Sequence, residues 1–366
     1  MKYRTLGKTG MSVSCIGLGG GMLGSPKTDY AVRIVERALE LGVNYFDTAR
    51  SYPDSEVVLG KGLKGKRETV YVSSKTNATT RDEAWRHIYE SLDRLQTNYV
   101  DNYHLHGLQN EDDLNARVGP GGALEALIEA KEQGLIRHIG CTSHVSRKLL
   151  VEALDRYDFE IILVPMNIVE REPLDELIPR CLEKEVGVTI MKPLATGLVP
   201  AGLALKWLMN QPIGAAVPGA TTIEEVTANS LVGHLEDPTL TKEEEKEAAR
   251  WAATLEHVRC RLCKACEPCP AGIPIAGTLG TDVIYDHYRT MGAQTFSSFP
   301  WSKERIEGDY GPRRQLIGQI ESCDSCGMCE KRCRYGLPVI SMLKSMTVPM
   351  KEIVRTWDVV RGQTDC

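Results

Sequence analysis

The chain has 366 residues, which suits one large domain or two ordinary ones at about 150 residues per domain. Hydrophobic residues make up 42% and charged residues 25%, which is typical of a globular protein and excludes a disordered chain, a coiled coil and a fibre. The net charge of -5 argues against a nucleic-acid binder, which needs a basic face. No apolar run reaches the roughly 18 residues that span a bilayer, and the N-terminal MKYRTLGKTG has no apolar core for export. We therefore expect a cytoplasmic protein without membrane or nucleic-acid partners.

Short apolar strands alternate with amphipathic helices over the first two thirds of the chain. The expected helices include residues 81–95, 122–132 and 147–156. The expected strands cover residues 15–18, 44–47, 70–74, 100–105, 137–141, 161–164, 188–191 and 215–217. Eight strands alternating with helices over about 240 residues predict an α/β fold, a (β/α)8 TIM barrel, whose catalytic residues lie at the C-terminal strand ends.

A glycine-rich stretch, Gly19–Gly24, offers a competing interpretation because it matches the dinucleotide-binding pattern G-x-G-x-x-G. The helix that this motif should open begins only at Ser25–Pro26, beyond the last glycine. A doubly wound nucleotide-binding fold also does not explain eight alternating units. We therefore prefer the barrel.

Polar residues follow the apolar strands at the expected C-terminal ends. They are Asp47, Lys75, His106, Ser143, Asn167, Lys192 and Gly219. Alone, Lys75 would be interpreted as a solvated surface lysine, and His106 as a strand-end histidine with its hydrogen bonds made inside the protein. Several of them at one barrel mouth indicate a catalytic site.

Specific motifs cover most of this region: RTLGKTGMSVSCIGLGG, NYFDTARSYPDSEVVLGKGL, VYVSSKT, ESLDRLQTNYVDNYHLHG, LIRHIGCTSH, IMKPLATGL and VPGATTIEEVTANS. From about Tyr3 to Leu235 the chain resembles the aldo-keto reductases. The resemblance implies a barrel that binds a nicotinamide cofactor and reduces an aldehyde or ketone, or oxidises the alcohol. The catalytic tetrad of that family falls on Asp47, Tyr52, Lys75 and His106.

The chemistry of such a reduction explains these residue types. Hydride transfer to a carbonyl leaves an alkoxide that needs a proton, and the Tyr52 hydroxyl can supply it if its pKa is lowered. Lys75 beside the phenol lowers that pKa, Asp47 keeps Lys75 charged, and His106 orients the substrate oxygen. His104 lies on the same face of its strand but deeper in the barrel, and is less suited to catalysis.

The resemblance also places the nicotinamide cofactor, with several departures from the family pattern. Ser143 and His144 would meet the carboxamide, with Asn167 nearby, and Lys192, Leu194 and Gly197 match the pyrophosphate loop. Leu163 stands where a glutamine is usual, and Met166 where a tyrosine stacks on the ring. A methionine can still pack against a ring, so binding is weakened in principle but is not excluded.

The adenosine end departs most from the family. Gly219, Ala220 and Glu225 occupy positions where NADP-preferring members carry Lys, Ser and Arg. A carboxylate repels a 2′-phosphate but accepts a hydrogen bond from a 2′-hydroxyl. We therefore expect NADH to be tolerated or preferred, with Asn229 as a candidate adenine contact.

The number of cysteines, twelve, is unusually high, and nine of them lie from Cys260 onward. One run is Cys260, Cys263, Cys266 and Cys269, and the other is Cys323, Cys326, Cys329 and Cys333. The second run has the spacing of two-cluster ferredoxins, in which the fourth cysteine of each run ligates the other cluster. The spacing predicts two 4Fe–4S clusters, and zinc is disfavoured because its sites usually pair two shorter loops.

The predicted ligand sets are Cys260, Cys263, Cys266 and Cys333 for one cluster, and Cys323, Cys326, Cys329 and Cys269 for the other. The first run has x2 where ferredoxins have x3, and Arg334 replaces a proline, so the exchange stays a hypothesis. Cys15, Cys141, Cys181 and Cys366 remain outside these sets; Cys15 and Cys141 lie on strands and are expected to be buried, and Cys366 is expected to be free. The combination resembles the aldo-keto reductases with a C-terminal dicluster domain. We place the barrel at residues 1–245 and a mostly α-helical ferredoxin-like domain at 246–366.

Basic residues surround both runs of cysteines. We read them as charge compensation for anionic clusters, although a docking patch for an electron carrier of the ferredoxin or flavodoxin type is an alternative. Three roles for the chain stay open: carbonyl reduction with structural or relaying clusters, a cluster-fed radical or reductive step at the mouth without obligatory nicotinamide, and a pure electron-transfer subunit. A barrel mouth could also hold a flavin between nicotinamide and clusters.

Overall fold

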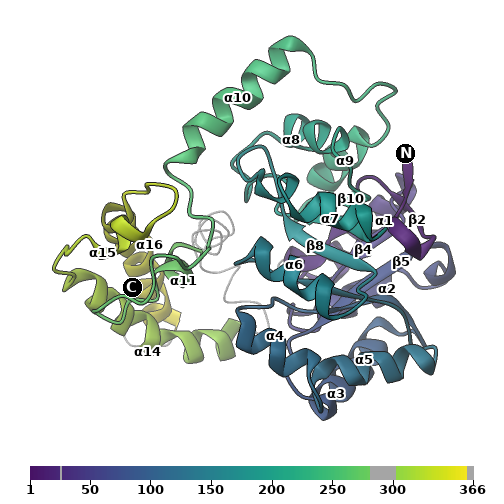
Figure 1. The fold of residues 1–366 in the computed structure, drawn as a ribbon, viewed down its shortest axis with the longest axis horizontal. Coiled ribbons are helices and arrows are strands. Elements are labelled where there is room, and N and C mark those ends of the chain that lie inside the picture. Colours follow the sequence, from purple (N-terminus) through teal and green to yellow (C-terminus); the bar gives the residue numbers. More distant parts are fainter. Residues whose placement is uncertain (25–26, 281–301, 361–366) are drawn as a thin grey trace. The chain divides into compact units, whose positions relative to one another are not determined.

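The computed structural model describes residues 1–24, 27–280 and 302–360 (Figure 1). Contacts divide the chain into one unit of Met1–Ala252 and a second of Ala253–Cys366. The expected boundary and this division both fall within helix α10 (Lys242–Glu256). Cys366 lies outside the described residues. In the part of the chain that the structure describes, no helix is long and apolar enough to cross a membrane.

The first unit is the predicted barrel. Its parallel strands neighbour one another in chain order: β3 (Leu18–Gly19), β4 (Tyr45–Asp47), β5 (Tyr71–Thr76), β6 (Val100–Leu105), β7 (Ile136–Thr142), β8 (Ile161–Pro165), β9 (Gly187–Met191) and β10 (Ala215–Ala216). The sheet closes on itself through parallel bridges between Ile16 and Ala216 and between Gly19 and Gly219. Strand side chains on the inside are therefore shielded all round.

The helices lie outside the strands (Figure 1). They are α1 (Thr28–Glu40), α2 (Ser55–Gly62), α3 (Arg81–Leu95), α4 (Glu111–Val118), α5 (Ala123–Glu132), α6 (Arg147–Arg156), α7 (Leu177–Glu183), α8 (Ala201–Met209) and α9 (Ile223–Val232). Helix α3 shows why they form: Ala84, Ile88, Leu92 and Leu95 recur at helical spacing and are buried. The Thr80 side chain caps this helix by accepting a hydrogen bond from the Glu83 amide.

A hairpin that the sequence reading missed precedes the barrel. It pairs β1 (Tyr3–Thr5) with β2 (Ser12–Ser14), around a 3-10 turn η1 (Gly7–Thr9). Leu6 and Met11 pack with Tyr45 and Leu163 in one buried cluster. A Cβ at Gly187 would lie only 2.6 Å from a Leu6 side-chain atom, so this glycine admits the hairpin. Strands of three residues are too short to show a clear alternation in sequence.

The glycine-rich stretch serves the closure of the barrel. Gly19 ends β3, the 3-10 turn η2 (Gly20–Met22) follows, and α1 begins only at Thr28. A Cβ at Gly19 would lie 2.6 Å from the Val217 carbonyl oxygen, and one at Gly20 would lie 2.8 Å from that of Asp47. These glycines allow backbones to approach, and the dinucleotide-fold interpretation is excluded.

The second unit is helical, as predicted. Its helices are α11 (Ile275–Leu279), α14 (Ser302–Glu321), α15 (Met328–Arg332) and α16 (Val339–Val360). Its core joins α11, α14 and α16 through the buried side chains of Ile275, Ile320, Leu343, Met350, Ile353 and Trp357. Cys266 belongs to this core, and Cys260, Cys269, Cys323, Cys329 and Cys333 pack against it. The first unit also contains two short 3-10 turns, η3 (Arg67–Thr69) and η4 (Glu172–Leu174).

Candidate functional site

Three neighbouring strands bring the tetrad together. Asp47 ends β4, Lys75 lies one residue before the end of β5, and His106 directly follows β6. Tyr52 lies in the loop between β4 and α2. Because these strands are parallel neighbours, their carboxyl ends meet at one mouth of the barrel.

Lys75 is the centre of this group. Its Nζ donates to Asp47 Oδ1 at 2.6 Å and to the Thr48 carbonyl oxygen at 2.5 Å. The same atom lies 5.0 Å from the centroid of the Tyr52 ring. Lys75 and Asp47 are only 1% and 4% exposed, so the ion pair is shielded from water. The rings of Tyr52 and His106 meet edge to face, with centroids 5.7 Å apart.

Burial and neighbouring charges determine the protonation states of Lys75 and Tyr52. Burial opposes the charge on Lys75, but Asp47 and Tyr52 outweigh it, so the pKa of Lys75 is raised and the side chain stays an ammonium. Burial raises the pKa of the Tyr52 hydroxyl by more than the Lys75 charge lowers it, so the net lowering expected from the sequence is not found in the free protein. Tyr52 is therefore protonated in the free protein, which is the form that can donate a proton.

His106 is held as a neutral side chain. Burial, followed by the charge of Lys75, lowers the pKa of His106 well below its usual range. Arg117 fixes the backbone at this point by donating to the His106 carbonyl oxygen at 2.9 Å, and its own Nε meets Asp113 at 2.7 Å. A neutral imidazole can donate a hydrogen bond to a substrate oxygen without adding charge.

The loop that carries Tyr52 is anchored to helix α3. Arg50 Nε donates to Glu90 Oε2 at 2.6 Å, and Arg94 Nη1 donates to the Arg50 carbonyl oxygen at 3.0 Å. Asp54, at the start of α2, adopts a left-handed φ of 50°. This turn brings the chain back to the barrel directly after Tyr52.

Two of the side chains expected at or near the carboxamide, Ser143 and Asn167, form hydrogen bonds within the protein. Ser143 Oγ donates to the Leu108 carbonyl oxygen at 2.8 Å and accepts from the amide of Ser146. Asn167 Nδ2 donates to Glu170 Oε2 at 2.7 Å, while its Oδ1 accepts from the amides of Val169 and Glu170. Both side chains shape loops at the mouth, and a cofactor would have to share these hydrogen bonds.

The other residues around the nicotinamide position differ in exposure. Met166 and Leu163 are 0% and 1% exposed, so both belong to the buried barrel wall. His144 is half-buried, and burial together with Lys192 lowers its pKa to about 3. The loop from Lys192 to Gly197, which includes Leu194, has left-handed φ angles at Lys192, Ala195, Thr196 and Gly197. Such a loop keeps a tight shape beside the mouth.

Glu225 has a local role at the adenosine end. It is the third residue of α9, and its Oε2 accepts from the amide and hydroxyl of Thr221 and from the Thr222 amide. Thr222 in turn accepts from the Glu225 amide, which completes a capping box. Gly219 is exposed and Asn229 is buried.

The mouth has features that suit a phosphate-bearing cofactor. Gly21 and Gly219 are exposed, and a Cβ at Gly21 would lie 3.8 Å from the Tyr52 ring, so backbone rather than side chain borders the tyrosine. Lys192 supplies a half-exposed cation close enough to lower the pKa of His144. Exposed backbone together with a cation suits the phosphates of a dinucleotide.

The second unit brings thiols of both runs to one cavity. A cavity of about 230 Å³ is lined by five cysteines: Cys266, Cys269, Cys323, Cys326 and Cys329. Its other lining residues include Pro268, Pro270, Ile273 and Ile275. Within residues 1–24, 27–280 and 302–360, no three metal-binding side chains converge as a site for a single ion would require. A largely apolar cavity lined by five thiols suits an iron–sulfur cluster, which is larger than a single ion.

The cysteines that lie near one another also match the exchanged ligand sets. Burial raises the pKa of Cys260 to about 11, and the charges of Cys263 and Cys333 add to this. Burial likewise raises the pKa of Cys329, with Cys269 contributing in the same direction. The fourth cysteine of each run is thus a neighbour of the other run.

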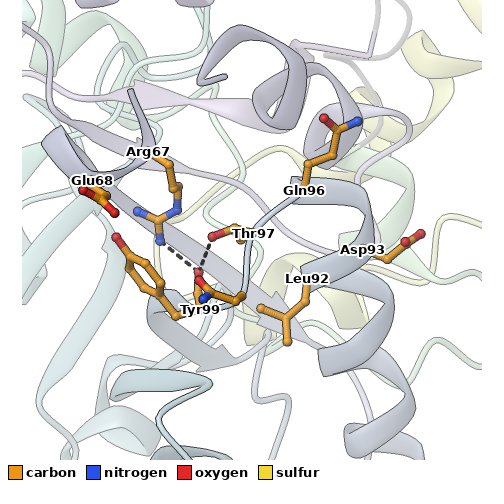
Figure 2. Close-up of a pocket in the computed structure, with 8 residues that line it drawn as sticks. Arg67, Glu68, Leu92, Asp93, Gln96, Thr97 and Tyr99 are labelled. Carbon is orange, nitrogen blue, oxygen red and sulfur yellow. Dashed lines mark hydrogen bonds between the residues drawn. The ribbon is translucent and has the colours of Figure 1, made fainter. Parts of the chain in front are cut away.

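A second hollow lies at the opposite end of the barrel, before β6. It has a volume of about 650 Å³ and is lined by Arg67, Glu68, Leu92, Asp93, Gln96, Thr97, Asn98 and Tyr99 (Figure 2). Arg67 donates to the Tyr99 carbonyl oxygen and to Asp101, so its charge is used in holding the strand. Because catalytic residues of barrels lie at the other end, this hollow is not a candidate for the catalytic site.

Comparisons with known proteins agree with this geometry. The aldo/keto reductase family matches residues 15–202, and a 4Fe-4S dicluster domain matches residues 259–337. The uncharacterized oxidoreductase YqkF of Bacillus subtilis is 30% identical over 213 residues, covering 54% of this chain and 67% of the relative. L-galactose dehydrogenase of Arabidopsis thaliana is 34% identical over 220 residues, with the same two coverages.

Solved structures resemble the barrel. The holo form of aldo-keto reductase AKR11C1 from Bacillus halodurans is 30% identical with a TM-score of 0.60, covering 69% of this chain and 96% of that one. An aldo/keto reductase from Klebsiella pneumoniae in complex with NADP and acetate is 25% identical with a TM-score of 0.59, covering 68% and 95%.

Proposed function

The chain belongs to the aldo/keto reductase family of oxidoreductases and carries a 4Fe–4S dicluster domain; on this premise we propose that it reduces an aldehyde or ketone with NAD(P)H, with Tyr52 as proton donor. The observation that carries the proposal is the convergence of Tyr52 and His106 on the buried Lys75–Asp47 pair. A nicotinamide supplies the hydride when it is bound. Every other role falls to side chains of the barrel.

Each member of the tetrad performs one step. Tyr52 is held protonated and donates its proton to the oxygen of the reduced carbonyl. Lys75 then stabilises the phenolate that remains, and Asp47 keeps Lys75 charged and in place. His106, neutral and edge-on to Tyr52, orients the substrate oxygen.

For the cofactor, Lys192 and the tight loop through Leu194 to Gly197 are the proposed diphosphate contacts, with His144 beside the carboxamide. Gly219 and Glu225 leave no cation for a 2′-phosphate, which supports NADH as tolerated or preferred. The capping role of Glu225 adds a limit: a 2′-hydroxyl would share an oxygen that already accepts three hydrogen bonds.

For the second unit we propose two 4Fe–4S clusters with exchanged ligands. The cavity lined by Cys269, Cys323, Cys326 and Cys329 supports one set, and the proximity of Cys333 to Cys260 supports the other. Cys326 is exposed, so electrons would enter or leave through this second cluster. An electron carrier of the ferredoxin or flavodoxin type is the corresponding partner.

One observation favours a second candidate function. Ser143 and Asn167 are engaged in internal hydrogen bonds and Met166 is fully buried, so fewer side chains are free to hold a nicotinamide. In that case the clusters would feed electrons to a reductive step at the mouth. Anaerobically purified, reconstituted protein separates the two candidates. Carbonyl-dependent consumption of NAD(P)H supports the first, and reduction only with a chemically reduced electron carrier supports the second.

A further inference from the structure

The barrel interior beneath the tetrad is polar, which is unusual for a packed core. Asp47 lies opposite Ser73, and Ser73 opposite Asn102, in the registers of β4 with β5 and β5 with β6. Register partners in a parallel sheet point to the same side, so these three side chains form one row. His104, two residues after Asn102, faces inward above that row and lies opposite Lys75.

Hydrogen bonds link this row. Asn102 Nδ2 lies 2.9 Å from Ser73 Oγ and 2.6 Å from His104 Nε2. All three residues are 0% exposed. An amide nitrogen only donates, so Ser73 Oγ and His104 Nε2 are both acceptors, and the imidazole carries its proton on Nδ1.

The direction of these bonds leads to Asp47. Ser73 accepts through its oxygen, so its own hydrogen can face either the Tyr45 hydroxyl or the carboxylate of Asp47, its partner on β4. Of these two neighbours the charged carboxylate is the stronger acceptor. Asp47 uses Oδ1 for Lys75, and its buried Oδ2 has no direct hydrogen bond from a described residue. Burial raises the pKa of Asp47, and after Lys75 the Ser73 hydroxyl is the group that opposes this rise.

Gly140 makes the position of His104 possible. It lies opposite His104 on β7, and a Cβ at this glycine would be 2.4 Å from His104 Nδ1. The ring therefore packs on bare backbone, which fixes the direction of Nε2 toward Asn102. Burial, with the charges of Lys75 and His106, lowers the pKa of His104 and keeps it neutral.

We propose that Ser73, Asn102 and His104 form a hydrogen-bonded chain that holds the Asp47 carboxylate, which makes His104 a positioning residue for the Lys75–Asp47 pair. His104 acts by fixing the orientation of the Asn102 amide. With His104 as acceptor, the Asn102 amide must present hydrogens to Ser73, and the Ser73 hydroxyl must then turn toward Asp47. Without that acceptor, Asn102 can rotate its oxygen toward Ser73 and draw the hydroxyl away. The inference rests on the proposed function only in assigning Lys75 and Asp47 to the service of Tyr52.

The test pairs His104→Leu with His104→Gln, which retains an acceptor, and with His87→Leu as a matched control. His87 is also buried and bonded to a hydroxyl, that of Thr76, but it takes no part in this chain. The first readout needs no activity: melting temperatures are compared in the wild-type and Asp47→Asn backgrounds. We expect His104→Leu to lower the melting temperature less in the Asp47→Asn background, His87→Leu to act equally in both, and His104→Gln to restore most of the loss.

The second readout is the pH profile of kcat/KM. The other titratable groups that act on Asp47 are Tyr45, Tyr52 and Lys75, and all three stay in place in these variants. Loss of a donor to a carboxylate raises its pKa, so His104→Leu should move the acid limb up by about one pH unit, with cofactor KM unchanged.

Equal melting losses in both backgrounds for His104→Leu would overturn the proposal, as would an unmoved acid limb. A wild-type protein that reduces no carbonyl would refute the proposed function instead, and the thermal comparison would still decide the role of His104.

Discussion

Replacing Lys75 by methionine perturbs the buried ion pair on which the tetrad depends. The two partners are 1% and 4% exposed and 2.6 Å apart, so Lys75→Met leaves Asp47 as an uncompensated charge away from water. Breaking a buried pair in this way costs about 3–5 kcal/mol. For a unit of about 250 residues, each kcal/mol lowers the melting temperature by roughly 2–4 °C, so we expect a loss of about 6–20 °C.

Two further variants separate charge from packing. Adding Asp47→Asn to Lys75→Met removes the stranded charge, so we expect most of the lost stability to return. Turnover should stay low in both, because Tyr52 has lost the cation that stabilises its phenolate. Lys64→Met, at an exposed lysine, serves as control and should stay within about 0.5 kcal/mol of the wild type. The ion pair does not contribute the stability assigned to it if the melting temperature of Lys75→Met equals that of the wild type. The same holds if the double variant has no higher melting temperature than Lys75→Met.

Four further expectations concern pH, the helix cap, the cofactor and the clusters. Burial holds the pKa values of His87, His104 and His106 below the usual range, so the unfolded chain binds protons that the native barrel does not. Stability should therefore fall as pH decreases below about 6.5, by about 2 kcal/mol at pH 5 for a fully buried histidine; a melting temperature that is flat from pH 7 to 5 would contradict this. Glu225→Ala should lower the free energy of unfolding by about 0.5–2 kcal/mol, because the capping box is lost, as measured by chemical denaturation. An unchanged denaturation midpoint would show that this cap does not contribute to stability. Glu225→Arg should tighten NADPH relative to NADH in binding titrations, and NADPH binding at least tenfold tighter than NADH in the wild type would refute the expected preference. Cys269→Ser and Cys333→Ser should each disturb one cluster, and a different one, in electron paramagnetic resonance spectra; loss of the same signal in both would rule out exchanged ligands.

The strands and the residues at their ends could be predicted because burial on both faces of a parallel sheet produces apolar runs with few alternatives. The expected strand at 100–105 and the helices at 81–95 and 147–156 match β6, α3 and α6 residue for residue. The β1–β2 hairpin was missed because its partners are three residues long and its role is tertiary: Leu6 and Met11 pack into the barrel.

The site was predictable in residue type but not in hydrogen-bond partners. The sequence predicts Ser143, Asn167 and Glu225 as cofactor contacts, yet each is hydrogen-bonded to nearby backbone, a competition that a sequence pattern does not reveal. His104 was set aside as too deep. Its importance depends on the register that places it opposite Lys75 and Gly140. A signal was present in the inward-facing polar residues of β5 and β6, but two polar residues in a strand are ordinary until their partners are known.

The measurement that tests the central claim most directly is the turnover of Tyr52→Phe on a panel of aldehydes and ketones, with anaerobically purified and reconstituted protein. Phenylalanine keeps the ring that meets His106 and Lys75 and removes only the proton donor. We predict that carbonyl-dependent oxidation of NAD(P)H falls by about two to four orders of magnitude while cofactor binding is unchanged. Unchanged turnover in Tyr52→Phe would contradict the account.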